Sequence, residues 1–140
     1  MELNDIIRNM VIEAIKSQID GNIGDPGKIV FKNSNDDSLV TAYFAPTSMV
    51  VHRGKGTFFD ISPYLRGVVT VEGFANKWSI QNAAGFELIS GTCGDQNHLD
   101  KDIIFNTEDL HWYQNDVIVI ESLSIEIPSG NNEYITEPEV

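Results

Sequence analysis

Hydrophobic residues recur at helical spacing over residues 4–19, close to the start of the chain. Placed at about 100° per residue, they form two neighbouring apolar stripes on one helix. The first stripe holds Leu3, Ile6, Ile7, Met10, Val11 and Ala14, and the second, which Arg8 interrupts, holds Ile12, Ile15 and Ile19. A helix that lies on a sheet usually needs a single stripe of roughly 100°. The pattern therefore predicts either a helix clamped between the sheet and a long loop, or a helix whose second stripe contacts another subunit.

From residue 28 onward the pattern changes to short apolar or alternating runs that end at turn residues. These runs cover residues 28–32, 39–44, 48–52, 57–61, 67–74, 77–81, 86–90, 102–105 and 116–127. Short strands at intervals of about ten residues are typical of sandwiches and barrels. No second helical pattern of useful length is present to connect parallel strands. We therefore expect a mainly β protein, an antiparallel β-sandwich or jelly-roll-like barrel of about 8–9 short strands with one N-terminal α-helix.

The last run, residues 116–127, changes character along its length. Every residue from Val117 to Ile120 is apolar, whereas apolar and polar residues alternate after Glu121. A continuous apolar run indicates a strand buried on both faces, and alternation indicates one face in water. We therefore expect this strand to begin inside the protein and to end at its surface.

The chain divides into three parts by pattern. Residues 1–20 form the helix that packs on the domain, residues 28–127 form the β-sandwich domain, and residues 128–140 form an acidic tail without periodicity. The tail has two interpretations. It is either a frayed end or, because it carries Tyr134 and Ile135, an arm that docks on a neighbouring chain.

The composition is that of one folded domain. The chain has 140 residues, 41% of them hydrophobic, and a single cysteine, so no internal disulfide is expected. Asp5, Arg8 and Glu13 interrupt the apolar positions of residues 1–20, which argues against a signal peptide. No run approaches the roughly 18 apolar residues of a membrane span. We therefore expect a cytoplasmic or virion location and no transmembrane segment.

The formal net charge is −12, and most of it lies in residues 100–140. Such a surface repels phosphate backbones, so we expect no nucleic-acid partner. Acidity also has the simpler role of keeping a protein soluble. The main basic concentration is Arg53 and Lys55, with Arg66 further along the chain. These residues either receive the acidic tail of another subunit or belong to an ordinary solvated turn.

Reactive residue types gather in "GTCGDQNHLDKD", residues 91–102, which includes Cys93 and His98. The spacing of Asp95, Asp100 and Asp102 does not fit an EF-hand loop. No second cysteine–histidine pair is near enough to complete a transition-metal site. A cysteine nucleophile would need a base such as His98 in contact. We therefore interpret the segment as a polar connection between strands, with a weak cation site at the three aspartates as the alternative, and expect no cofactor.

Aromatic residues are concentrated in residues 108–116, between acidic positions. Together with Trp78, the side chains of His111, Trp112 and Tyr113 would suit a stacking platform for a sugar. The alternative is that Trp112 fills one end of the core and Tyr113 caps it.

The order of one helix followed by a sheet resembles the layout of small virion components, such as tail-completion, neck and capsid-decoration proteins. The resemblance concerns layout and includes no motif. It implies a non-catalytic structural or assembly protein whose partners are copies of itself and other protein subunits. The residues expected at its interfaces are Ile12, Ile15, Ile19, Arg53, Lys55, Arg66, Tyr134 and Ile135.

Two other functions are compatible with the sequence. One is a β-sandwich module that binds carbohydrate or peptide through Trp78, His111, Trp112 and Tyr113. The other is a small β-barrel enzyme, which requires His52, His98 and His111 to converge in a pocket with acidic residues. The fold alone does not decide between them and an assembly role.

Overall fold

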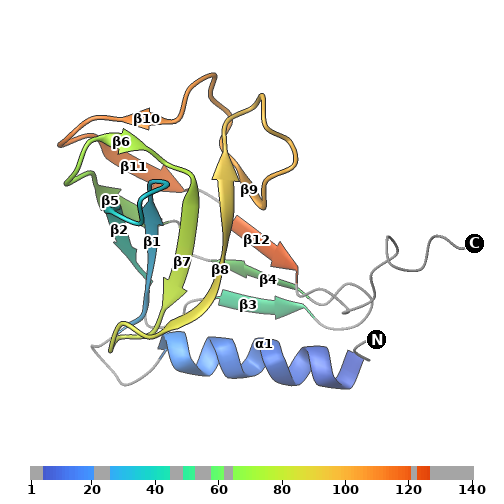
Figure 1. The fold of residues 1–140 in the computed structure, drawn as a ribbon. Coiled ribbons are helices and arrows are strands. Elements are labelled where there is room, and N and C mark those ends of the chain that lie inside the picture. The colour runs from blue at the N-terminus through green and yellow to red at the C-terminus, as the bar shows by residue number, and fades with distance from the viewer. Residues whose placement is uncertain are drawn as a thin grey trace, which may run out of the picture.

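A computed structural model describes residues 5–20, 26–44, 49–52, 58–61, 65–120 and 123–126. This part of the chain is mainly β with one helix, as the sequence predicts (Figure 1). The elements are α1 (Asp5–Asp20), β1 (Lys28–Lys32), β2 (Ser38–Tyr43), β3 (Met49–His52), β4 (Phe58–Ile61), β5 (Leu65–Val68), β6 (Gly73–Phe74), β7 (Lys77–Gln81), β8 (Glu87–Gly94), β9 (Ile103–Ile104), β10 (His111–Trp112), β11 (Val117–Ile120) and β12 (Leu123–Glu126). Within this part of the chain, no helix has the length and apolar character needed to cross a membrane.

The largest sheet has five strands in the order β2-β1-β7-β8-β9 and curls into half a barrel. Its pairs are antiparallel except β8 with β9, which is parallel and departs from the antiparallel arrangement that the sequence predicts. The inner face carries Phe31, Trp78 and Ile80, which are buried in one apolar core. Alternation along β1 and β7 therefore places these large side chains inside the curl.

The core is completed by aromatic residues from outside the regular sheet. Phe31, Phe105 and Trp112 lie edge-to-face, and each pair of ring centroids is 5.6 Å apart. Trp112 belongs to the short β10, which pairs with β6 and was not among the predicted strands. Edge-to-face contacts of this kind add to the stabilisation that burial of the rings provides. Trp112 therefore fills the core, one of the two roles that the sequence allows for it.

A two-stranded ribbon of β5 and β11 continues from the β2 side of the main sheet. Val40 and Val69 form an isolated antiparallel bridge, and the Thr70 amide donates to the Leu39 carbonyl over 2.8 Å. The ribbon approaches closely because β5 contains Gly67. A Cβ atom at Gly67 would lie 2.6 Å from the Thr41 carbonyl oxygen, well inside van der Waals contact. Glycine is therefore required for this strand to pack on β2.

A third sheet has the order β12-β4-β3, and α1 runs alongside β3 at the bottom of the molecule (Figure 1). The C-terminal end of α1 is fixed to the main sheet. The Gly27 amide donates to the Ile19 carbonyl over 2.7 Å, and the Asn82 side-chain amide donates to Gln18 over 3.3 Å. A Cβ atom at Gly27 would lie 2.5 Å from the Gln81 carbonyl oxygen, so this junction also depends on a glycine. These contacts attach the end of the helix that carries Gln18 and Ile19 to the main sheet.

Three predicted runs are divided or extended in the structure. Residues 67–74 contain the end of β5 and all of β6. The Val69 amide still bonds the Asp116 carbonyl next to β11, whereas the Thr70 amide donates to the Leu39 carbonyl, so the chain changes partner there. Residues 116–127 are divided between β11 and β12. Residues 91–94, expected in a polar connection, instead extend β8. The sequence pattern therefore located most of the strands. It did not show where one strand ends and the chain begins to pair with another strand.

Candidate functional site

The two apolar stripes of α1 have different environments. Ile12, Ile15 and Ile19 are buried in the core, and Arg8 between them is buried as well. These isoleucines were predicted to contact another subunit, and the structure corrects that assignment, because they pack inside their own chain. The Ile19 end of the helix is also bonded to Gly27, next to β1. Any interface on α1 must therefore use the opposite stripe.

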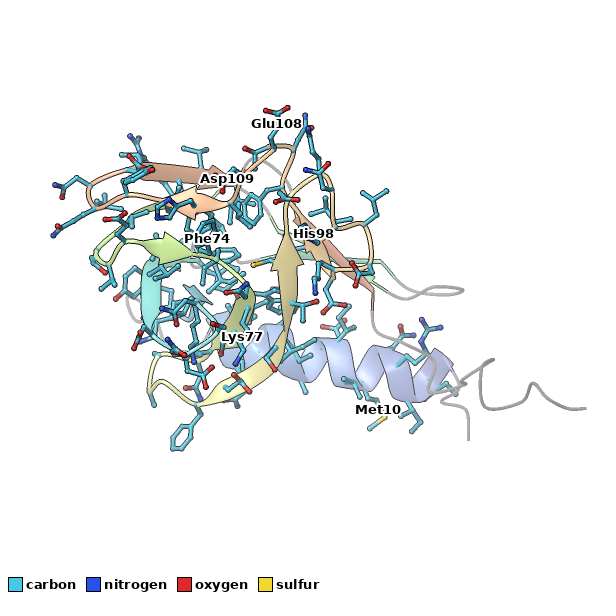
Figure 2. The ribbon with its side chains drawn as sticks, turned by 45° about the horizontal axis from the view of Figure 1, so that its top comes forward. Met10, Phe74, Lys77, His98, Glu108 and Asp109 are labelled. Carbon is cyan, nitrogen blue, oxygen red and sulfur yellow. The ribbon has the colours of Figure 1, made fainter. Side chains whose placement is uncertain are left out.

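The outer stripe of α1 consists of Ile6, Ile7, Met10, Val11 and Ala14, all of which are exposed. Ile6 retains 70% of its accessible surface and Met10 retains 62%. Figure 2 shows the Met10 side chain directed away from the body of the protein. Ile6 and Met10 line a shallow hollow together with Asn9 and Glu13. A contiguous apolar stripe in water is uncommon on a monomer and is typical of an interaction surface.

A second exposed apolar surface lies on the β5–β11 ribbon. Val117 pairs with Val68 and Val119 pairs with Arg66, so these four side chains share one face. Val68, Val117 and Val119 retain 50%, 47% and 45% of their accessible surface. We call these three residues with Arg66 the valine face. Arg66, which was predicted at an interface, is therefore an exposed neighbour of apolar side chains.

The sequence predicts that residues 117–120 are buried on both faces of their strand, and the exposed valine face shows that this prediction is wrong. Only the inward residue Ile120 is buried within β11, and Ile118 is half-buried. The ribbon is two strands wide in the described part of the chain, and nothing from that part covers its outer side. The continuous apolar run therefore marks a strand with one buried face and one exposed apolar face.

Residues 95–98, in the middle of the segment 91–102, form a tight polar turn. Asp95 accepts from the Asn97 amide over 2.9 Å, and its carboxylate lies 2.7 Å from the Nδ1 atom of His98. These two contacts, the Asn97 bond first, hold the pKa of the Asp95 carboxyl below its ordinary value. Asp102 instead accepts from the Thr92 amide over 2.8 Å, on the side of β8.

The three aspartates of this segment are therefore engaged separately. Asp95 bonds within its own turn, Asp102 bonds to Thr92, and Asp100 is exposed with the Lys101 ammonium 3.9 Å away. Among the described residues, no group of three or more His, Cys, Asp or Glu side chains is placed to hold a metal ion. The weak cation site predicted at Asp95, Asp100 and Asp102 is not formed by this geometry.

A pocket of about 340 Å³ opens beside this turn. Its lining includes Phe74, Cys93, His98, Lys101 and Asp109. Burial raises the pKa of the Cys93 thiol to about 12, although the nearby Lys101 ammonium partly opposes this. Only a minute fraction of the thiol is ionised near neutral pH, and the thiolate is the nucleophilic form. Cys93 therefore contributes an inert wall to the pocket.

The stacking platform predicted from Trp78, His111, Trp112 and Tyr113 does not form, because its two tryptophans are not at the surface. Trp78 and Trp112 are buried, and the Trp78 indole donates to the Thr92 carbonyl over 3.0 Å, so neither ring can stack on a ligand. A row forms instead from the exposed Phe74 and Tyr113 with the half-buried His111 between them. Phe74 and His111 are stacked with centroids 4.5 Å apart and planes at 17°, and His111 and Tyr113 are also 4.5 Å apart. Phe74 connects this row to the pocket.

The three histidines predicted for an enzyme site, and four of the predicted interface residues, remain to be placed. His98 lines the pocket, whereas His111 stacks on Phe74 and lies 3.2 Å from the Glu72 carboxylate. The side chain of His52 lies outside the described residues, so its convergence with the other two stays a prediction. Arg53, Lys55, Tyr134 and Ile135 also lie outside the described residues.

Comparisons with known proteins give no assignment: no protein-family model, no curated protein and no solved structure matches the chain.

Proposed function

We propose that the chain is a non-catalytic assembly protein, a subunit of a larger oligomer such as a phage particle component of the head-decoration, neck or tail-completion type. The observation that carries this proposal is the outer stripe of α1. The same helix anchors itself in the core through Ile12 and Ile19 and presents Ile6 and Met10 to water on its other side. A helix that needed only to cover its own sheet would have polar residues there.

The free energy available from this stripe is substantial. Fully burying an isoleucine or methionine side chain contributes about 1.5–3 kcal/mol, and a few such anchors usually dominate an interface. Ile6 and Met10 are the most exposed members of the stripe. Covering them with a partner would also remove a surface that otherwise favours non-specific aggregation.

The virion setting rests on the helix-then-sheet layout, and the partners would be copies of the chain and other protein subunits. Tyr134 and Ile135 of the tail, and Arg53 and Lys55, remain proposed additional contacts. The net charge of −12 supports protein partners over nucleic acid, because phosphate backbones would be repelled. We also propose that the sheets close into a sandwich or jelly-roll-like barrel, which the Val40–Val69 bridge between β2 and β5 supports.

Light scattering on the full chain tests this proposal. Met10→Lys places a charge in the centre of the outer stripe and should shift an assembled species to monomer. Asn106→Lys, which adds the same charge at an exposed position in the loop after β9, should leave the mass unchanged. An assembled species that tolerates Met10→Lys would reject the outer stripe as its interface.

The inert thiol supports a non-catalytic role. With its pKa near 12, Cys93 is not an activated nucleophile, although His98 lines the same pocket. The pair of His98 and Asp95 lies at the surface and is bonded within one turn. This arrangement is sufficient to order a loop, and it brings no nucleophile into contact with a base.

A second candidate function, carbohydrate binding, is favoured by one observation. Phe74 is exposed beside the pocket, and His111 supports its other side in a stacked arrangement. Aromatic faces next to polar side chains such as Asp109 are a common way to bind sugars. Phe74→Ala should abolish any sugar-dependent change in NMR shifts of the pocket residues, whereas Phe86→Ala, at an exposed turn, should not. An unchanged response in Phe74→Ala would eliminate this candidate.

A further inference from the structure

Among the described residues, the outer stripe of α1 and the valine face are exposed apolar surfaces on different elements. The outer stripe of α1 is one side of a helix, and the valine face is one side of a two-stranded ribbon. Figure 1 places α1 along the bottom of the molecule and the ribbon at its upper left, with β1, β2 and β7 between them. The two surfaces therefore lie at different ends of one molecule, so a single partner docked on one of them leaves the other exposed.

The two surfaces have the chemistry of a helix packed on a sheet. Isoleucine, methionine and valine on one helical stripe are the residues that usually cover a sheet. Val68 and Val117 directly oppose each other, and β-branched cross-strand pairs form a flat apolar surface suited to that role. A helix from another molecule would cover these valines as α1 covers its own sheet.

The charges on the two surfaces also differ in sign. The segments LRGV and VIVI of the ribbon contain one charged residue, Arg66, on the valine face. The hollow on α1 is lined by Glu13 beside Ile6 and Met10. Contact between two α1 helices would bring like-charged carboxylates together, whereas contact between α1 and the ribbon brings Glu13 toward Arg66. Charge complementarity of this kind selects partner and orientation.

We infer that the outer stripe of α1 in one copy docks on the valine face of the next copy, so that the chain assembles head to tail. This inference rests on the proposed assembly function and specifies its contact. A head-to-tail contact joins two different surfaces. It therefore closes a ring if the rotation between copies allows and otherwise extends a filament.

Two blocked variants and their mixture test the inference. Met10→Asp blocks the helix surface, and Val117→Asp blocks the ribbon surface; both positions are exposed, so each chain should retain its fold by circular dichroism. Each variant alone should be monomeric by analytical ultracentrifugation. Mixed in equal amounts they should form a complex of one copy of each and no larger species, since one intact surface of each kind remains.

The outcomes separate this inference from the proposed function. A wild-type chain that stays monomeric at high concentration overturns both. A wild-type oligomer that Met10→Asp disrupts but Val117→Asp leaves intact retains the assembly role and overturns the head-to-tail contact. Two monomeric variants whose mixture stays monomeric would show that an intact helix surface does not bind an intact valine face, which also overturns the contact. Arg66→Glu should weaken wild-type association at least about tenfold, and Lys28→Glu on β1, the matched charge change, should not.

Discussion

Burial decides the chemistry of the single cysteine. Cys93 was a candidate nucleophile by residue type, but its side chain is buried and the pKa of its thiol is raised to about 12. The sequence supplied the residue and its neighbours, while burial depends on strands far apart in the chain. Contact with the core could therefore not be predicted from the segment around Cys93.

The reactivity of Cys93 follows from this pKa. At pH 8 the thiolate fraction is roughly a thousandfold smaller for a pKa of about 12 than for an ordinary thiol with a pKa of 9.0. We expect alkylation by iodoacetamide at pH 8 to be slower by about that factor in the folded protein than in urea. Mass spectrometry of the alkylated fraction over time measures both rates. Equal rates would contradict the burial of the thiol.

The lowered pKa of Asp95 predicts a pH-dependent contribution to stability. Because the folded pKa lies below the ordinary value of 3.8, the contribution is present above that pH and is lost as the pH falls through the folded pKa. Asp95→Asn should lower the melting temperature at pH 7, and the difference from wild type should shrink below pH 3.8. Asp100→Asn makes the same charge change at an exposed side chain and should have a smaller effect at pH 7. A difference that grows on acidification would contradict the assignment.

At the scale of elements, the helix illustrates what a sequence pattern can and cannot determine. Periodicity correctly located one helix with two apolar stripes, but it could not show which stripe faces the core. The choice shows only in the fold, where Ile12 and Ile19 are fully buried and Ile6 and Met10 are exposed. Val68 and Phe74 were missed for a similar reason, since their exposure depends on pairing with β11 and β10.

The orientation of α1 predicts that replacing isoleucine by alanine lowers the free energy of unfolding much more at position 19 than at position 6. Ile19→Ala removes a fully buried side chain and should lower the free energy of unfolding by about 2–5 kcal/mol. Ile6→Ala changes an exposed side chain and should stay within about 0.5 kcal/mol under dilute conditions. Urea unfolding measures both values, and Ile19→Val, with an expected loss of about 0.5–1.5 kcal/mol, serves if the alanine variant does not fold. Similar losses at both positions would contradict the orientation of the helix.

At the scale of the whole molecule, the proposed assembly must overcome repulsion between copies that each carry a net charge of −12. Raising the ionic strength from about 0.01 M to about 0.15 M shortens the Debye length from about 30 Å to about 8 Å. We therefore expect association to tighten with salt, because repulsion is screened while the apolar contact is retained. Sedimentation velocity at several salt concentrations measures this dependence. Association that weakens with salt would indicate a contact dominated by opposite charges.

The central claim is that the outer stripe of α1 is covered by another subunit. The mass of the full chain in solution, measured by light scattering over a wide range of concentration, tests it most directly. We expect a species of several times the 15.6 kDa of one chain, which dissociates when Met10 is replaced by lysine. A constant mass of 15.6 kDa for the wild-type chain at every concentration would contradict it.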